Sequence, residues 1–117
     1  MKVLICDDSR LILDIFDMVL ERLGLEAVRV DNGNHAVDRV KEDDEIGLVF
    51  MDLNMPEISG SDTCAQIKAI RPKLPVIAIS GMTDEELKAV DVDGFDEVFR
   101  KPVKKQELAS LVERYAS

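Results

Sequence analysis

The stretch VFMDLNMPEISG, residues 49–60, decides the fold because it begins as a strand and changes character at an acid. Residues 48–51 are apolar at every position, which predicts a strand covered on both faces of a parallel sheet. Beyond Asp52, the Met55-Pro56 pair predicts a stiff loop and Gly60 predicts a turn into a helix. Two interpretations of Asp52 are open: the acid is where the strand meets solvent, or the strand holds the acid against other groups.

The rest of the chain alternates short apolar runs with helical patterns. Strands are predicted at Val3 to Cys6, Ala27 to Val30, Leu48 to Met51, Val76 to Ile79 and, more weakly, Val98-Phe99. Helices are predicted from Leu11 to Leu23, Asn34 to Glu42, Ser61 to Ile70, Thr83 to Val90, and around Leu108, Leu111, Val112 and Tyr115. This order predicts an α/β fold of the flavodoxin-like, doubly wound (βα)5 class, with five parallel strands in the order 2-1-3-4-5.

Size and composition limit the classes of function. With 117 residues, of which 46% are hydrophobic, the chain predicts one domain over residues 1–117. The formal net charge of -9 argues against a nucleic-acid-binding surface. No apolar run approaches a membrane span and the first residues lack a signal-peptide core, so we expect a cytoplasmic protein that contacts no membrane. Cys6 and Cys64 are expected to be reduced packing residues, and His35 a surface residue.

Polar side chains stand where the predicted strands end. Asp7 and Asp8 follow the first strand, Asp52 the third, Ser80 the fourth, and Lys101 the fifth. Ligands of such sheets bind outside the carboxyl ends of the strands, so we expect these side chains on one rim. Two carboxylates about 4 Å apart repel by roughly 4 kcal/mol at an effective dielectric constant of about 20, so converging acids need a proton or a cation. Mg²⁺ prefers oxygen ligands and fits this cluster, with Mn²⁺ as an alternative.

These groups are the parts of a phosphoryl-transfer site. A metal ion and the Lys101 ammonium neutralise charge on the phosphoryl oxygens while a nucleophile attacks in line. An aspartate can itself be that nucleophile and form an acyl phosphate. Asp52 is the best candidate, because it stands alone on a central strand whereas Asp7 and Asp8 are adjacent to each other.

The motifs VLICDDS, DNG, VFMDLNMPEISG, LPVIAISG and FRKPV, taken in order, resemble those of response regulator receiver domains, in particular single-domain regulators of the chemotaxis type. The resemblance covers essentially all 117 residues. It implies a protein of a two-component phosphorelay, which takes a phosphoryl group onto Asp52 from a sensor histidine kinase or a histidine phosphotransfer protein. Such a protein is not an enzyme but assists its own phosphorylation and dephosphorylation, and phosphorylation controls its binding to an output protein, here unknown.

The resemblance also implies roles for individual residues in metal binding. Asp8, Asp52 and the backbone carbonyl of Asn54 would ligate Mg²⁺. Asp7 would act mainly through a metal-bound water.

Further implied roles concern the phosphoryl group. Ser80 would donate a hydrogen bond to one phosphoryl oxygen, and Lys101 would pair with another. Gly81 would leave room for the group, and the Lys101-Pro102 peptide bond would be cis.

Two positions bear on kinetics and on switching. Residues 54 and 82 flank the path of the hydrolytic water in this family, and here they are Asn54 and Met82. Because Met82 orients no water, we expect slow self-dephosphorylation. The family usually has an aromatic residue where this chain has Val98, and Phe99 is expected to point to the opposite face of its strand. We still expect output through the surface of the fourth helix, the fifth strand and the fifth helix.

Three other functions compete with this interpretation. A phosphatase of the haloacid-dehalogenase type needs an acid where this chain has Asn54. A flavodoxin would bring a flavin phosphate against Asp7 and Asp8, which would repel it. A receiver that works as an unphosphorylated interaction module is the third possibility, although each acceptor-site position is filled.

Overall fold

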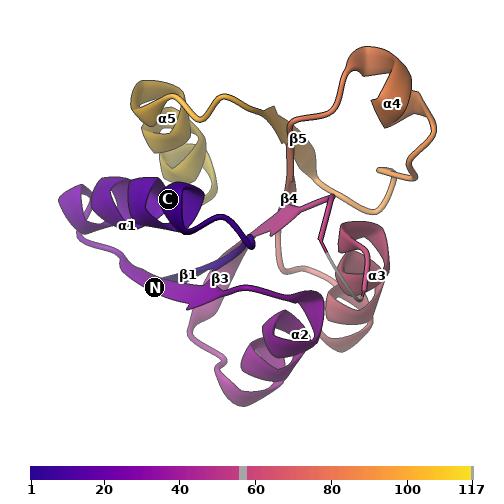
Figure 1. Ribbon diagram of the computed structural model, residues 1–117. Coiled ribbons are helices and arrows are strands. Elements are labelled where there is room, and N and C mark those ends of the chain that lie inside the picture. Colours follow the sequence, from indigo (N-terminus) through magenta and orange to yellow (C-terminus); the bar gives the residue numbers. More distant parts are fainter. Residues whose placement is uncertain (56–57, 117) are drawn as a thin grey trace.

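A computed structural model describes residues 1–55 and 58–116 (Figure 1). Over these residues its sheet has five strands: β1 (Lys2–Cys6), β2 (Glu26–Val30), β3 (Ile46–Asp52), β4 (Val76–Ser80) and β5 (Glu97–Arg100). The strands pair in parallel in the order β2-β1-β3-β4-β5. The predicted fold and strand order are therefore confirmed.

The helices form a layer on each face of the sheet. They are α1 (Arg10–Arg22), α2 (Gly33–Glu42), α3 (Gly60–Ile70), α4 (Asp84–Lys88) and α5 (Lys105–Ala116). α1 and α5 cover one face and α2 and α3 the other, while α4 projects beyond the β4–β5 edge (Figure 1). In the part of the chain that the structure describes, no helix combines the length and apolar character that crossing a membrane requires.

Alternating strand residues build two cores, one on each side of the sheet. One core, under α1 and α5, contains Val3, Ile5, Leu48, Phe50, Ile77 and Ile79, and the other, under α2 and α3, contains Leu4, Cys6, Val49, Met51 and Val76. Phe50 of β3 packs edge-to-face against Phe16 of α1, with ring centroids 4.9 Å apart. Burial of both strand faces is the physical reason for the unbroken apolar runs in the sequence.

Side-chain caps fix where the helices begin. Ser9 and Asn32 accept hydrogen bonds from backbone N–H groups in the first turns of α1 and α2. Ser59 does the same for α3, so this helix begins at Gly60 rather than at the predicted Ser61.

The fourth helix was predicted too long. It was expected from Thr83 to Val90, but α4 spans Asp84–Lys88, with Thr83 as its N-cap. Thr83 and Glu86 form a capping box that stabilises the first turn. None of the residues of α4 is buried, so no packed face stabilises further turns.

Both cysteines are buried free thiols, as predicted. The Cys6 Sγ lies 3.4 Å from the Met55 Sδ, and the Cys64 thiol donates to the Gly94 carbonyl at 3.4 Å. Burial raises the pKa of the Cys6 thiol to about 12 and that of the Cys64 thiol to about 11. Pro56, the second residue of the Met-Pro pair expected to stiffen the loop, lies outside the described residues.

Candidate functional site

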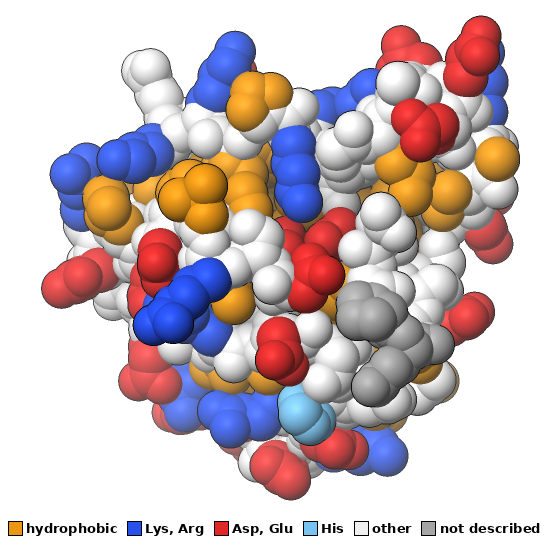
Figure 2. All heavy atoms as spheres, viewed as in Figure 1, with side chains coloured by type: hydrophobic (Ala, Val, Ile, Leu, Met, Phe, Trp, Pro, Cys, Tyr) orange, Lys and Arg blue, Asp and Glu red, His pale blue; other side chains and the backbone are white. Residues whose placement is uncertain are grey.

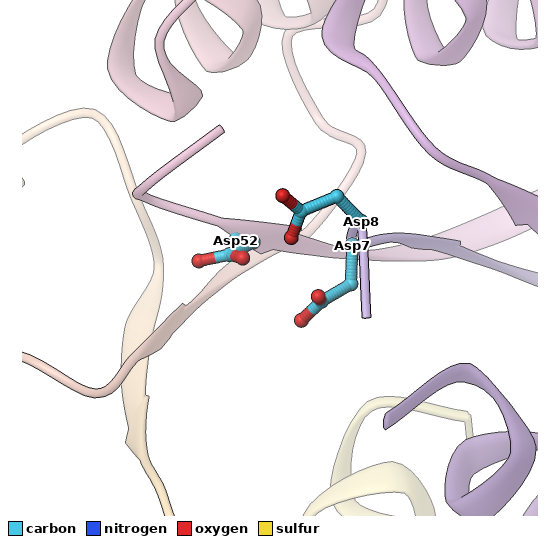
Figure 3. Close-up of side chains that lie close together, drawn as sticks. All are labelled: Asp7, Asp8 and Asp52. Atoms are coloured by element: carbon cyan, nitrogen blue, oxygen red, sulfur yellow. The ribbon is translucent and has the colours of Figure 1, made fainter. Parts of the chain in front are cut away.

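The ends of β1 and β3 bring three carboxylates together. One oxygen from each of Asp7, Asp8 and Asp52 lies within 4.8 Å of the others (Figure 3). Asp7 is 0% exposed and Asp52 is 4% exposed, whereas Asp8 is open to solvent. These acids were expected on one rim because parallel strands end at the same edge of a sheet, and they do lie together there.

Backbone N–H groups donate hydrogen bonds to two of these carboxylates. The backbone N–H of Ser9 donates to Asp7 Oδ1 at 2.8 Å, and that of Asn54 donates to Asp52 Oδ1 at 3.0 Å. The other Asp7 oxygen, Oδ2, is buried without a hydrogen-bond partner among the described residues. A buried carboxylate oxygen without a donor is costly, which suits a site that binds a cation.

Lys101 is the cation that faces these acids. Its Nζ lies 3.5 Å from Asp7 Oδ2 and 3.7 Å from Asp52 Oδ2. These are ion-pair distances rather than short hydrogen bonds. One ammonium against three carboxylates leaves the cluster with excess negative charge.

The excess charge and the burial act on the acceptor candidate. Burial raises the pKa of the Asp52 carboxyl to about 6, and the charges of Asp7 and Asp8 add to the increase, while the Asn54 N–H and Lys101 oppose it. A bound cation would favour the ionised carboxylate and reverse this shift. The oxygen-only donor set and the buried Asp7 Oδ2, which accepts no hydrogen bond from the described residues, both fit a hard divalent ion such as Mg²⁺.

Ser80 and Lys101 close the other side of the site, at the ends of β4 and β5. Ser80 is buried, and its Oγ accepts a hydrogen bond from the Met82 N–H at 3.1 Å. The backbone N–H of Lys101 donates to the Ser80 carbonyl at 2.7 Å, which ties the two strand ends together. The Lys101-Pro102 peptide bond is cis, as the resemblance implied.

A cleft opens over these groups. It is lined by Asp8, Asp52, Asn54, Gly81, Met82, Glu86 and Lys101. Figure 2 shows acidic side chains in the middle of this face, next to a basic side chain. Asp7 and Ser80 are buried beneath it.

Sequence reasoning named every residue of this lining except Glu86. Glu86 belongs to α4, and its distance from the cleft depends on the loop that leads out of β4. The Thr83…Glu86 capping pattern could have fixed the start of the helix. It could not have shown that this acid lines the same cleft as the acceptor.

Gly60 allows the start of α3 to lie close to the backbone of Asp52 and Leu53. A Cβ atom on Gly60 would collide with the Asp52 carbonyl oxygen and lie 2.8 Å from the Leu53 Cα. Gly60 is the first residue of α3 and has no left-handed backbone conformation. Gly60 was expected to allow the turn into a helix starting at Ser61, and the structure places it in the first turn of that helix. The constraint on this residue is steric, because the helix begins directly against the backbone of the acceptor.

The fifth strand places its side chains as predicted. Phe99 is buried in the core under α1 and α5, whereas Val98 pairs with Ala78 in the sheet register and is half-buried on the opposite face. Next to them, the Arg100 guanidinium donates to Asp84 Oδ1 at 2.6 Å and to the Met82 carbonyl at 3.2 Å. Arg100 thereby links β5 to both the loop after Ser80 and the start of α4.

His35 is an exposed side chain near the N-terminus of α2. Its Nδ1 lies 3.0 Å from the Asn32 amide nitrogen and 3.7 Å from Asp31 Oδ1. It does not line the cleft, which agrees with its expected place on the surface.

The family of the chain follows from its sequence profile. Residues 3–113 match the response regulator receiver domain. The chain belongs to this family. Membership connects this receiver domain to two-component signalling and disfavours the phosphatase and flavodoxin alternatives.

Similar proteins agree with this assignment. The receiver domain is 33% identical over 115 residues to the sensory transduction protein RegX3 of Mycobacterium tuberculosis, covering 95% of this chain and 48% of RegX3. It is 35% identical over 83 residues to the autoinducer 1 sensor kinase/phosphatase LuxN of Vibrio harveyi, covering 71% of this chain and 10% of LuxN. The receiver domain thus spans less than half of RegX3 and a tenth of LuxN.

Solved structures show the same fold. A response regulator receiver domain protein from Clostridium thermocellum superposes with a TM-score of 0.85 at 31% identity, covering 97% of this chain and 92% of that one. A CheY-like receiver domain from Methanospirillum hungatei gives a TM-score of 0.87 at 23% identity, covering 97% and 90%.

Proposed function

We propose that this receiver domain, residues 1–117, accepts a phosphoryl group on Asp52 from a phosphohistidine of a sensor histidine kinase or a histidine phosphotransfer protein. The observation that carries the proposal is the nearly buried Asp52 carboxylate at the floor of a cleft, with Lys101 and two further carboxylates beside it. We propose further that this reaction takes place in the cytoplasm.

The proposed cofactor is Mg²⁺, with Mn²⁺ as an alternative. Asp8, Asp52 and the backbone carbonyl of Asn54 would hold the ion, with Asp7 behind them acting through water. When bound, it would supply positive charge against the phosphoryl oxygens. The absence of a hydrogen bond to Asp7 Oδ2 from the described residues and the proximity of the three carboxylates support this assignment.

The protein's own groups have distinct parts in the transfer. An Asp52 carboxylate oxygen attacks phosphorus, the bond from phosphorus to the histidine nitrogen breaks, and the imidazole leaves with the electron pair. Lys101, already 3.7 Å from Asp52, would pair with a phosphoryl oxygen. The Ser80 hydroxyl accepts from the Met82 N–H, so its own proton is left to donate to the phosphoryl group.

Loss of the phosphoryl group is proposed to be slow. Asn54 and Met82 line the cleft beside Asp52, and the Met82 thioether is too weak an acceptor to orient an attacking water.

Output is proposed to occur through the surface formed by α4, β5 and α5. A phosphoryl group adds a charge of about -1.5 to -2, which can draw Ser80 and the following loop toward the acceptor. Because Arg100 holds both that loop and α4, movement of the loop would reach this surface even though Val98 replaces the usual aromatic residue.

Incubation with Mg²⁺ and acetyl phosphate, followed by intact-mass spectrometry, tests the proposal. We expect one phosphoryl adduct on the wild type, none on Asp52→Asn, and a normal adduct on Asp31→Asn, which removes an exposed acid at the end of β2. Absence of the adduct from the wild type, even with a phosphorylated histidine phosphotransfer protein as donor, or an equal adduct on Asp52→Asn, would contradict it.

A further inference from the structure

We propose that Glu86 determines which phosphodonors reach Asp52, because its carboxylate stands at the cleft and disfavours free anionic donors relative to a phosphohistidine carried by a docked protein. This inference rests on the proposed function and adds donor selection to it.

The placement of Glu86 is fixed by its own helix. Its side chain lines the same cleft as Asp52 and Lys101. Its Oε1 accepts from the Thr83 N–H at 3.2 Å, while its backbone N–H donates to Thr83 Oγ1 at 3.2 Å. This reciprocal pair holds the carboxylate at the start of α4 instead of leaving it to move freely in solvent.

The carboxylate carries its charge at neutral pH. The hydrogen bond from the Thr83 backbone keeps the pKa of Glu86 below its ordinary value. The nearby cations have other partners: Arg100 pairs with Asp84, and Lys101 lies between Asp7 and Asp52. Among the ion pairs of the described residues, none involves Glu86.

A free donor must bring its own negative charge past this group. Acetyl phosphate is a dianion at neutral pH and phosphoramidate is a monoanion, and either one enters a cleft that already holds Asp8 and Asp52. A phosphohistidine on a partner protein arrives with docking contacts that offset such repulsion. Glu86 therefore penalises the small donors more than the protein-bound one.

Transfer from either small donor needs no further reactant. In acetyl phosphate the bond between phosphorus and the acyl oxygen breaks, and acetate leaves with the electron pair; in the phosphoramidate monoanion the bond between phosphorus and nitrogen breaks, and ammonia leaves with the electron pair. A new bond forms between phosphorus and an Asp52 carboxylate oxygen.

The experiment compares Glu86→Gln with Glu85→Gln. A glutamine at position 86 keeps the capping box, because its amide oxygen still accepts from the Thr83 N–H. Glu85→Gln removes the same charge from the neighbouring exposed residue of α4, which does not line the cleft. Initial rates of Asp52 phosphorylation are measured in excess Mg²⁺ with acetyl phosphate and with phosphoramidate, at low and at high ionic strength.

We expect Glu86→Gln to raise the rate with acetyl phosphate by about two- to fivefold at low ionic strength. The gain should be smaller with the monoanion phosphoramidate, and it should vanish at high ionic strength because salt screens the charge. Glu85→Gln should match the wild type.

Equal rates for Glu86→Gln and the wild type, or an equal gain in Glu85→Gln, would overturn the inference. A gain that persists at high ionic strength would also overturn it, since that result indicates a structural effect. If neither donor phosphorylates any of the three proteins, the inference fails as well. Phosphorylation of Asp52 by a phosphorylated histidine phosphotransfer protein would then show that the proposed function stands without it.

Discussion

At the scale of single residues, the cluster around Asp52 holds more negative charge than the surrounding protein groups neutralise. Lys101 faces Asp7 and Asp52 at ion-pair distance, and Asp7 Oδ2 has no donor among the described residues. The folded chain therefore keeps an arrangement that costs stability when no cation is bound.

This cost gives a pH-dependent prediction for Asp52→Asn. The pKa of Asp52 is about 6 in the folded protein and 3.8 ordinarily, so folding takes up a proton between these values and stability falls as pH rises through them. In a chelator at pH 7.5, Asp52→Asn should raise the free energy of unfolding by on the order of 2 kcal/mol, and near pH 3.5 the gain should disappear. Urea denaturation at both pH values measures this. An equal gain at both would contradict the assigned pKa.

Gly60 gives a second prediction at this scale. Alanine is the better helix former, but its Cβ would collide with the Asp52 carbonyl, and the backbone atoms there cannot move cheaply. Gly60→Ala should therefore lower the free energy of unfolding by about 2 kcal/mol and slow the phosphorylation of Asp52.

Gly81→Ala is the matched control for stability. A Cβ at that position would meet the Lys101 Cδ at 3.5 Å, an ordinary van der Waals distance. Its free energy of unfolding should change by less than about 0.5 kcal/mol. If the two alanine variants unfold at the same urea concentration, the steric account of Gly60 is wrong.

At the scale of secondary-structure elements, the most accurate predictions were for segments marked by an unbroken apolar run or by an N-cap residue. The strands buried on both faces are apolar at every position, and Ser9, Asn32 and Ser59 cap helices at recognisable places. β3 begins at Ile46, earlier than the predicted Leu48. The prediction started too late because Gly47 interrupts the apolar pattern. A Cβ at Gly47 would lie 2.6 Å from the Met1 sulfur, so this glycine makes room for a contact that local sequence does not reveal.

α4 shows the opposite case. Its pattern extended to Val90, but the helix ends earlier because none of its residues is buried. For the same reason the sequence did not predict that Glu86 lines the cleft. Asp7, Asp8, Asp52 and Lys101 were predicted, because the carboxyl ends of parallel strands lie on one rim of the sheet. Residues carried by a packed strand could be placed from sequence, and a residue carried by an unpacked helix could not.

The weak packing of α4 predicts a local effect of Thr83→Ala. Loss of the capping box should increase amide hydrogen exchange in residues 83–90, while the free energy of global unfolding changes by less than about 1 kcal/mol. Ser59→Ala removes the cap of the packed helix α3, and its main effect should be on global stability. Hydrogen-exchange mass spectrometry and urea denaturation of the two variants distinguish these outcomes. Unchanged exchange over residues 83–90 in Thr83→Ala would rule out the capping box as the main support of α4.

At the scale of the whole molecule, β3 separates two cores and ends at the acceptor. Because β3 is central in the sheet, the Asp52 side of the candidate site is supported by both cores, whereas α4 on the other side has no buried residue. A cation bound at the strand ends would hold β1 and β3 together, so its effect should extend to the stability of the entire fold.

We therefore expect Mg²⁺ to raise the thermal unfolding midpoint. At one hundred times the dissociation constant, the gain in free energy should be about 2.7 kcal/mol. Asp8→Asn, which removes an exposed member of the cluster, should lose most of the increase, whereas Asp31→Asn should keep it. Calorimetry with Mg²⁺ and with a chelator measures the effect. An equal increase in both variants would place the binding of Mg²⁺ elsewhere on this acidic chain.

The two buried thiols have a practical consequence for following such changes. Burial and the raised pKa values of Cys6 and Cys64 leave little thiolate for reaction with maleimides. A cysteine introduced by Glu85→Cys on exposed α4 would then carry a fluorophore or spin label at one position, with both native cysteines left in place. Movement of α4 could be recorded optically in the otherwise unaltered chain as Asp52 gains and loses its phosphoryl group.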